Sequence, residues 1–344
     1  MKDICKKSIK MIAFTICAGI VFSFISNYFE RKTFTGPWNY MSKLNEFYAS
    51  EEDTLDYIGV GSSHLYCTIN PLEVWNESGT AGFVLATQQQ PLVASYHYIK
   101  EAFKTQSPNY VILEGFMITG DSNYDSAVLY DAIDPLKPSL NKLQMINSLV
   151  EYEKRPEYYF NVLKYHTRWD TVQAKEINTL FNEPVDTYKG FVPLKGDYLG
   201  KNRIPDEENT KDVALSDFHR DTLNDIYDLV TKNGAELILL FGPYDAEDVR
   251  LCEMVKAEKA WAREKSIDIL DYSELLESIE INPECDYYDS GHLDASGAAK
   301  VSRHFAAYLK EKGAEENTLV DRNKWQTDYD AYRKSFAEEL EDKK

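Results

Sequence analysis

Four short apolar runs, separated by longer stretches of helical periodicity, constrain the fold of this chain more than any other feature of its sequence. Each run ends in glycine, serine or an acidic turn, as buried parallel strands do. The expected strands are Tyr57–Gly61, Tyr110–Glu114, Glu236–Phe241 and Ile267–Leu270. The expected helices are Leu92–Thr105, Asp217–Asn233, Ala246–Lys265 and Ala295–Lys312. This alternation predicts an α/β fold with one doubly wound, mostly parallel sheet.

Residues 121–215 break the alternation. They are rich in Tyr, Asp, Asn, Pro and Lys, and helical patterns occur near Pro138–Glu153 and Pro156–Trp169. We interpret this segment as an insertion between sheet strands that covers the functional site. The predicted organisation is therefore an N-terminal segment, a stalk with an entry helix (Trp38–Tyr48), a main domain that contains the insertion, and a charged C-terminal tail that packs peripherally or frays. These parts cover residues 1–32, 33–55, 56–312 and 313–344.

The N-terminal segment contains nineteen uncharged, mostly apolar residues, Met11–Phe29, with three lysines shortly before them. At ~1.5 Å per residue in a helix, this run approaches the ~30 Å thickness of a bilayer's hydrocarbon core. A cleaved signal peptide is the alternative, but its apolar region is usually only ~7–15 residues long, and no clear cleavage site follows. We therefore expect an uncleaved signal-anchor, a single transmembrane helix in the cell membrane. The preceding lysines favour a cytoplasmic N-terminus, which makes the rest of the chain extracytoplasmic.

The formal charge of −19 is unevenly distributed, because residues 1–33 carry +4 and the remainder therefore carries −23. Such an acidic surface repels polyanions, so the sequence excludes nucleic acid as the main partner. The five cysteines show no metal-ligand spacing, so no metal site is expected, although one disulfide among Cys67, Cys252 and Cys285 stays open. The pattern Gly59-x-Gly61-x-x-His64 lacks the third glycine of a dinucleotide fingerprint, so no nucleotide cofactor is expected either.

Gly61-Ser62-Ser63 follows the first predicted strand. Ligands of open α/β sheets bind at the carboxyl ends of the strands, and loops placed there often carry function. This position makes Ser63 the candidate nucleophile, with Ser62 as the alternative. His64 comes next in the chain, and we expect its side chain to point away from the serine.

A second cluster, Tyr288-Asp289-Ser290-Gly291-His292, lies far downstream. The spacing of Asp289 and His292 lets both side chains point into one site. Asp289 would accept a hydrogen bond from His292 Nδ1–H and fix the tautomer, so that Nε2 faces the serine and works as a general base. A simpler interpretation is an acidic loop in which Asp294 caps the following helix, and both can hold at once. The other histidines are weaker candidates. Together the two clusters predict acyl transfer through an acyl-serine.

These two blocks resemble those of the SGNH/GDSL hydrolase superfamily, which has a Gly-Asp-Ser-like block after its first strand and Asp-x-x-His before its last helix. Here Ser62 replaces the usual aspartate. The resemblance implies a three-layer α/β/α, flavodoxin-like fold and a catalytic domain over residues 56–312. The chain is most similar to membrane-anchored members that serve teichoic-acid D-alanine transfer or partner multi-span membrane O-acyltransferases. The stretch Lys164–Trp169 also resembles these members, with no role implied.

The resemblance further implies that the loop at Leu85–Pro91 donates a backbone N–H to the oxyanion. The candidates are Thr87, Gln88 and Gln89, with the side chain of Gln90 as a substitute donor. The family's asparagine donor has no match near Glu114-Gly115-Phe116. The oxyanion hole would then consist of the Ser63 N–H and one loop amide.

These observations predict a membrane-anchored serine esterase or O-acyltransferase that acts on ester-linked acyl groups of a cell-surface glycan or polymer. The acyl group would pass from an ester donor to water or to a hydroxyl acceptor, and the insertion favours transfer because it would exclude water. The alternative is a catalytically inactive module that binds a surface glycan or a membrane acyltransferase. The missing asparagine favours that alternative, whereas the complete set of Ser63, Asp289 and His292 opposes it.

Overall fold

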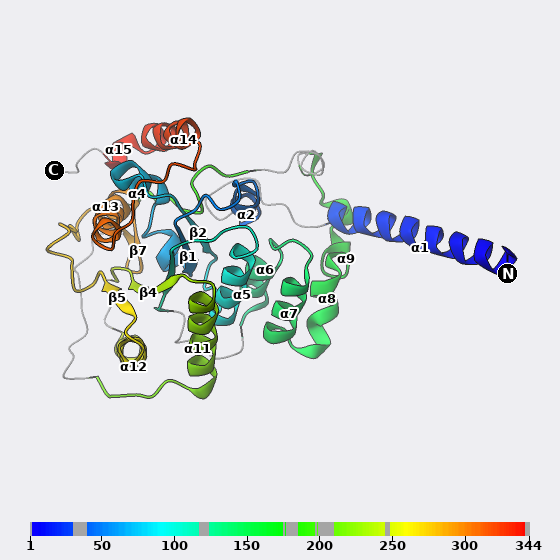
Figure 1. The fold of residues 1–344 in the computed structure, drawn as a ribbon, viewed down its shortest axis with the longest axis horizontal. Helices are drawn as coiled ribbons and strands as arrows, with labels where there is room; N and C mark the ends of the chain where they lie inside the picture. The colour runs from blue at the N-terminus through cyan, green and yellow to red at the C-terminus, as the bar shows by residue number, and fades with distance from the viewer. Residues whose placement is uncertain are drawn as a thin grey trace.

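A computed structural model describes residues 2–29, 40–116, 124–174, 176, 185–196, 198, 210–244 and 248–340. Its centre is a five-stranded sheet in the order β2-β1-β3-β4-β5, in which every neighbouring pair is parallel (Figure 1). The strands are β1 (Tyr57–Gly61), β2 (Gly82–Ala86), β3 (Tyr110–Glu114), β4 (Glu236–Phe241) and β5 (Asp268–Asp271). The prediction of an α/β fold with a mostly parallel sheet is confirmed.

Both faces of this sheet are buried, which explains why its strands are apolar throughout. Alternate residues of β4 show the division: Leu237, Leu239 and Phe241 belong to one apolar cluster, and Ile238 and Leu240 belong to another. The first cluster includes apolar side chains of α5 (Leu92–Ala102) and α11 (Asp217–Lys232). The second includes those of α3 (Ser63–Tyr66) and most of the core-facing residues of α13 (Ala295–Glu311).

The predicted strands and helices agree closely with the structure. Three strands have the predicted bounds and β5 starts one residue late, but β2 was not among the four predicted runs. The remaining helices of the main domain are α4 (Pro71–Ser78) and α12 (Val249–Glu264). Asp294 caps α13 by accepting from the backbone N–H groups of Ser296 and Gly297, as predicted. The entry helix is α2 (Tyr40–Tyr48), and the predicted start at Trp38 lies outside the described residues.

The described part of the insertion is a string of short helices. They are α6 (Ser126–Ile133), α7 (Leu140–Leu149), η2 (Tyr152–Lys154), α8 (Arg155–Tyr159), α9 (Asn161–Tyr165) and η3 (His166–Asp170). The amide of Asn141 in α7 joins them to α5, where it contacts His97 Nδ1 at 2.8 Å and donates to Glu101 at 2.8 Å. The later segment 185–196 runs back to the sheet, where Val84 N donates to Lys189 O and Val192 N donates to Tyr66 O.

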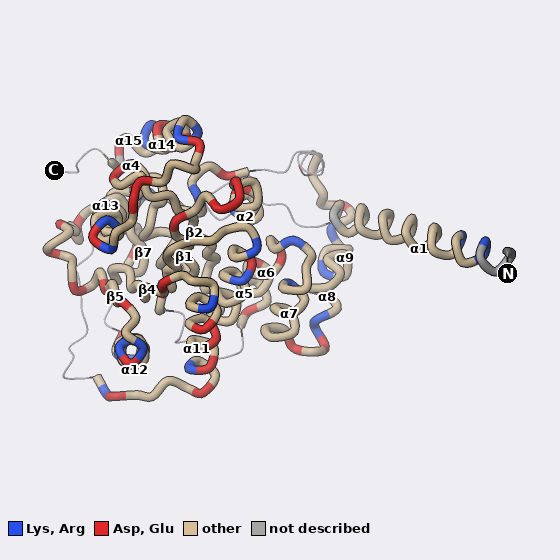
Figure 2. Tube along the Cα trace, viewed as in Figure 1, with Lys and Arg blue, Asp and Glu red and all other residues tan. Residues whose placement is uncertain are grey.

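The helix α1 (Lys2–Phe29) extends away from the rest of the structure (Figure 1). Its Lys6–Ser26 portion is long and apolar enough to cross a membrane, and none of it is buried in the protein. Figure 2 shows that its charged residues lie only near the N-terminus, whereas acidic side chains are spread over the main domain. The structure therefore supplies one possible membrane anchor.

The C-terminal segment packs against the main domain. It forms α14 (Arg322–Ser335) and α15 (Ala337–Leu340), and the rings of Trp325, Tyr332 and Phe336 are buried in the apolar core. Trp325 lies against Trp75 of α4, with ring centroids 5.8 Å apart. Exposed charged residues such as Arg322, Lys324 and Lys334 gave this segment the appearance of a tail, so its composition hid an apolar face.

Lys189 joins three distant segments through buried ion pairs. Its Nζ lies 2.6 Å from Glu46 of α2 and 2.6 Å from Asp328 of α14. Burial raises the pKa of Glu46 to about 7, although Lys189 acts in the opposite direction. The same two carboxylates raise the pKa of Lys189 despite its burial, so the lysine stays charged.

Replacing this cation should destabilise the fold strongly. Lys189→Met leaves Glu46 and Asp328 buried without their shared partner, which costs about 3–5 kcal/mol for a broken buried pair. The free energy of unfolding of the full chain in detergent measures this loss. Lys324→Met, which alters an exposed lysine of α14, is the control and should change stability by no more than about 0.5 kcal/mol. Equal losses in the two variants would contradict the role of the ion pairs.

Candidate active site

The loop after β1 gives its two serines different positions. Ser62 is the N-cap of α3, and its buried hydroxyl accepts from His64 N at 3.3 Å. Ser63 is the first helical residue, and its Oγ lies 2.8 Å from His292 Nε2. The loop also requires glycine at position 61, because a Cβ there would lie 2.4 Å from the Cβ of Glu114. Of the two candidate nucleophiles, Ser63 is therefore the one in contact with an imidazole.

A small hairpin positions the acid and the base. Its strands are β6 (Tyr287–Asp289) and β7 (His292–Leu293), and Asp289 pairs directly with His292. The turn donates Gly291 N–H to Asp289 Oδ1 at 2.8 Å, which fixes the carboxylate. Because α13 begins immediately after β7, the cap at Asp294 anchors the hairpin's exit.

The three side chains form a continuous hydrogen-bonded chain. His292 Nδ1 lies 2.8 Å and 3.0 Å from the two carboxylate oxygens of Asp289, and His292 Nε2 lies 2.8 Å from Ser63 Oγ. Burial acts to raise the pKa of Asp289, but hydrogen bonds from His292 and Gly291 outweigh it and hold the pKa below its usual value. An ionised carboxylate only accepts, so it places the proton on Nδ1 and leaves Nε2 to accept from the Ser63 hydroxyl.

His64 also belongs to this site, through a contact with His292 that the sequence did not predict. Its ring stacks on that of His292, with centroids 5.1 Å apart and planes 15° apart. Burial, helped by the neighbouring His292, lowers the pKa of His64 to about 3. His64 is therefore neutral at physiological pH. Its ring stacks on the His292 ring and does not compete with His292 for a proton.

Glu114, at the end of β3, holds the serine loop in place. Its Oε2 accepts from Ser62 N at 2.8 Å and its Oε1 accepts from Phe116 N at 2.5 Å. Burial raises the pKa of this carboxyl, and these hydrogen bonds oppose the shift. Glu114 lies in the stretch where the sequence offered no asparagine donor. Sequence reasoning missed its role because the contact depends on the pairing of β1 with β3.

A second buried carboxyl, Glu258 of α12, lies behind Glu114. It is fully buried, and neither of its oxygens has a hydrogen-bond partner in the described part of the chain. It lies against Gly115, where an added Cβ would be 2.7 Å from Glu258 Oε2. Burial raises the pKa of Glu258 well above its usual value, and the charge of Glu114 adds to this shift.

The predicted oxyanion loop adjoins the serine loop, because Ala86 of β2 pairs with Gly61 of β1. Two of the four candidate residues in this loop already donate their N–H groups to other acceptors. Gln88 N donates to the Tyr40 hydroxyl at 2.9 Å. The side-chain amide of Gln90 donates to Ser95 Oγ at 3.0 Å, and its backbone N–H donates to Thr87 O. The predicted loop donor is therefore narrowed to the N–H groups of Thr87 and Gln89.

No group of three or more His, Cys, Asp or Glu side chains in the described residues could hold a metal ion.

Comparison with known proteins does not identify a family: no protein-family model matches the chain, and no curated protein matches it. The chemistry of the site must therefore be argued from its own geometry.

Glu114→Gln should impair the site. The amide retains one carbonyl acceptor, but its NH₂ group faces a backbone N–H that also donates, which costs about 1–3 kcal/mol for an unsatisfied buried group. We expect a lower melting temperature and slower reaction of Ser63 with a fluorophosphonate probe. Glu236→Gln, at the opposite end of the neighbouring strand β4, is the control. Unchanged reactivity in the Glu114 variant would show that the carboxylate does not position the loop.

Glu258→Gln should stabilise the protein increasingly as pH rises. The folded-state pKa of Glu258 is raised, so above the unfolded-state pKa of about 4.3 the folded chain retains a proton that the unfolded chain releases. This difference costs stability, and the cost grows with pH until the folded-state pKa is reached. Thermal unfolding at pH 5 and pH 8 measures the effect. A benefit that is the same at both values would contradict the raised pKa.

Proposed function

We propose that this chain is a membrane-anchored serine esterase or O-acyltransferase of the SGNH type. The observation that carries the proposal is the 2.8 Å contact between Ser63 Oγ and His292 Nε2, two side chains that are 229 positions apart in the sequence. A serine, an imidazole and a carboxylate in this arrangement are recognised by geometry and role rather than by sequence position. Their location at the carboxyl end of β1 also agrees with where α/β sheets bind ligands.

The proposed reaction begins with attack of Ser63 Oγ on the acyl carbonyl of an ester. His292 Nε2 takes the hydroxyl proton and returns it to the departing alkoxide, while Asp289 stabilises the imidazolium. The result is an acyl-Ser63 and a released alcohol. Water or an acceptor hydroxyl then attacks the acyl-enzyme, with His292 again removing the proton, and regenerates Ser63.

The oxyanion that forms in each step needs hydrogen-bond donors. The Ser63 N–H lies in the first turn of α3, where helical amides have no intrahelical acceptor. The N–H of Thr87 or Gln89 would be the second donor. Each such donor contributes roughly 10²–10³ in rate.

The strand order supports the SGNH assignment and its three-layer architecture. The chain leaves β1 toward β2 on one side and leaves β3 toward β4 on the other, so the connections after these two neighbouring strands run in opposite directions. Such switch points are where open α/β sheets bind ligands. The lysines before the apolar part of α1 support an extracytoplasmic catalytic domain. An ester-bearing glycan or polymer of the cell surface is then the accessible substrate, with a multi-span membrane O-acyltransferase as a candidate partner.

A non-catalytic binding module is the second candidate. One observation favours it: Glu114, in the place of the family's asparagine donor, accepts two hydrogen bonds instead of donating one. Such a protein would use the same site to hold a surface glycan or an acyltransferase partner without turnover.

Covalent labelling of the full chain in detergent distinguishes these functions. The wild type should react with a fluorophosphonate probe, Ser63→Ala should abolish the labelling, and His292→Ala should slow it about 10²–10⁴-fold because the general base is lost. Ser62→Ala is the matched control. It removes a helix cap worth about 1 kcal/mol and should retain labelling.

Circular dichroism must show that each variant is folded. Labelling that persists in Ser63→Ala would exclude Ser63 as the nucleophile. A folded wild type that neither labels nor hydrolyses p-nitrophenyl acetate would favour the binding module.

A further inference from the structure

Exposed apolar side chains are concentrated on the helical insertion. Outside α1, twelve large hydrophobic side chains are exposed in the described residues, and seven of them lie on α7–η3. We call these seven the apolar surface of the insertion: Leu140, Leu143, Tyr152, Tyr159, Phe160, Leu163 and Trp169. Trp169 is 73% exposed and Tyr152 is 77% exposed. Such a concentration marks an interaction surface rather than the scattered exposure found on any protein.

This surface is continuous with the end of α1. The rings of Phe22 and Phe160 meet edge to face, with centroids 5.7 Å apart. Val162 N donates to Ser26 Oγ at 3.1 Å, and the Arg168 guanidinium donates to Phe29 O at 3.1 Å. Figure 1 shows α7, α8 and α9 along the edge of the domain from which α1 departs. The stretch Lys164–Trp169, singled out by the sequence, lies in this contact region.

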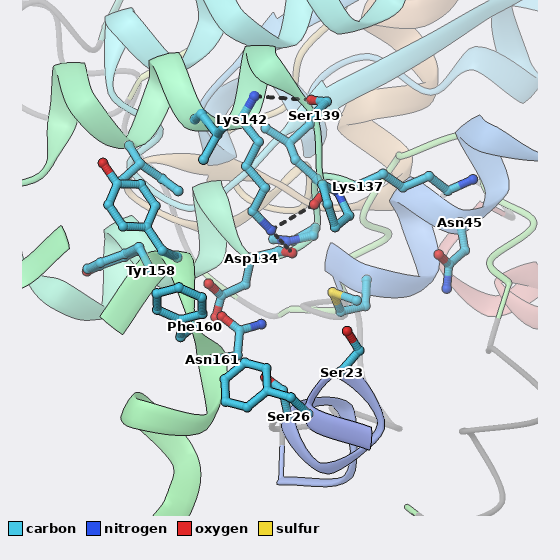
Figure 3. Close-up of a pocket in the computed structure, with 18 residues that line it drawn as sticks. Ser23, Ser26, Asn45, Asp134, Lys137, Ser139, Lys142, Tyr158, Phe160 and Asn161 are labelled. Carbon is cyan, nitrogen blue, oxygen red and sulfur yellow. Dashed lines mark hydrogen bonds between the residues drawn. The ribbon is translucent and has the colours of Figure 1, made fainter. Parts of the chain in front are cut away.

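A cavity of about 730 Å³ lies between α1 and the insertion. Phe22, Leu143 and Ile146 contribute apolar walls, and Ser23 and Ser26 come from α1. Figure 3 shows the labelled serines of α1 across from Phe160 and Asn161. Lys142 also lines this cavity. Its Nζ donates to the backbone carbonyls of Asp134 and Leu136. The insertion and α1 therefore border an open, largely apolar space beside the membrane-length helix.

We propose that the apolar surface of the insertion lies in the boundary between headgroups and acyl chains of the bilayer that α1 spans. The Lys6–Ser26 portion is the candidate span, so its last residues must reach that boundary. Side chains that contact Phe22 and Ser26 are then at the same depth. Tryptophan and tyrosine favour this zone, and exposed leucine and phenylalanine gain from entering it.

The charge of this region fits the same occupant. Residues 134–170 contain six basic and five acidic side chains, whereas the whole chain has a net charge of −19. An anionic membrane surface therefore repels this segment far less than it repels the rest of the domain. The insertion holds the domain on the membrane in a fixed orientation. This inference rests on the anchorage included in the proposed function, but it does not depend on catalysis.

Quenching by brominated lipids tests the proposal in the full chain reconstituted into phosphatidylcholine vesicles. In a Trp169→Phe background, a tryptophan is added by Leu163→Trp, by Tyr152→Trp or, as the control, by Leu319→Trp. Leu319 is 66% exposed and lies outside the insertion. Vesicles with brominated acyl chains should quench the emission added at positions 163 and 152, and leave the emission added at 319 unchanged. All three replaced residues are exposed, so the fold should tolerate each change.

Equal quenching at the three positions would overturn the proposal. The proposal would also be wrong if bromination left the emission at position 163 unchanged while the protein-to-lipid ratio altered it. A second copy of the chain would then cover the surface. Flotation of the vesicles after a carbonate wash separates the two inferences. If the chain floats but its emission is not quenched, α1 is an anchor and only the membrane contact of the insertion is refuted. If the chain does not float, both the anchor and that contact are refuted. Fluorophosphonate labelling of Ser63 is independent of either result.

Discussion

The carboxylate of Glu114 is the contact on which the geometry of the site depends. The pairing of β1 with β3 ends at Val60 and Leu113, whereas the pairing of β1 with β2 continues to Gly61. Beyond Val60 and Leu113, β1 and β3 no longer pair, and the next backbone N–H of the serine loop needs another acceptor. Glu114 supplies it by accepting from Ser62 N, and its other oxygen accepts from Phe116 N. The side chain of Glu114 thus replaces the backbone hydrogen bonds of the sheet at the point where β1 and β3 stop pairing.

The site then combines three local structures that are specified separately in the sequence. The cap at Ser62 starts α3 and places Ser63 in its first turn. The hairpin at residues 287–293 pairs Asp289 with His292, and the cap at Asp294 fixes where α13 begins. The neutral ring of His64 fills the space beside His292. His292 is the imidazole of this pair that contacts Ser63 Oγ, and His64 adds an uncharged ring beside it.

Local patterns predicted much of this architecture. The apolar runs gave the bounds of β1, β3 and β4, because buried parallel strands are apolar on both faces. The strand β2 (Gly82–Ala86) was not among the predicted runs, although it is as long as β1 and β3 and equally buried. Ser63, Asp289 and His292 could be selected from the sequence because each adjoins a recognisable turn. Glu114, Glu258 and the stacking of His64 could not be, because they depend on which distant segments become neighbours. The apolar face of α14 was likewise hidden among charged residues.

The buried ion pairs of Lys189 have a consequence for how the chain folds during synthesis. Glu46 and Lys189 emerge from the ribosome long before Asp328, which lies near the C-terminus. Domains generally begin to fold from the N-terminal side as they are made. Until α14 arrives, Lys189 has only one of its two carboxylates, and Trp75 lacks the ring of Trp325 that covers it. The nascent domain therefore stays open at this corner until α14 has been synthesised.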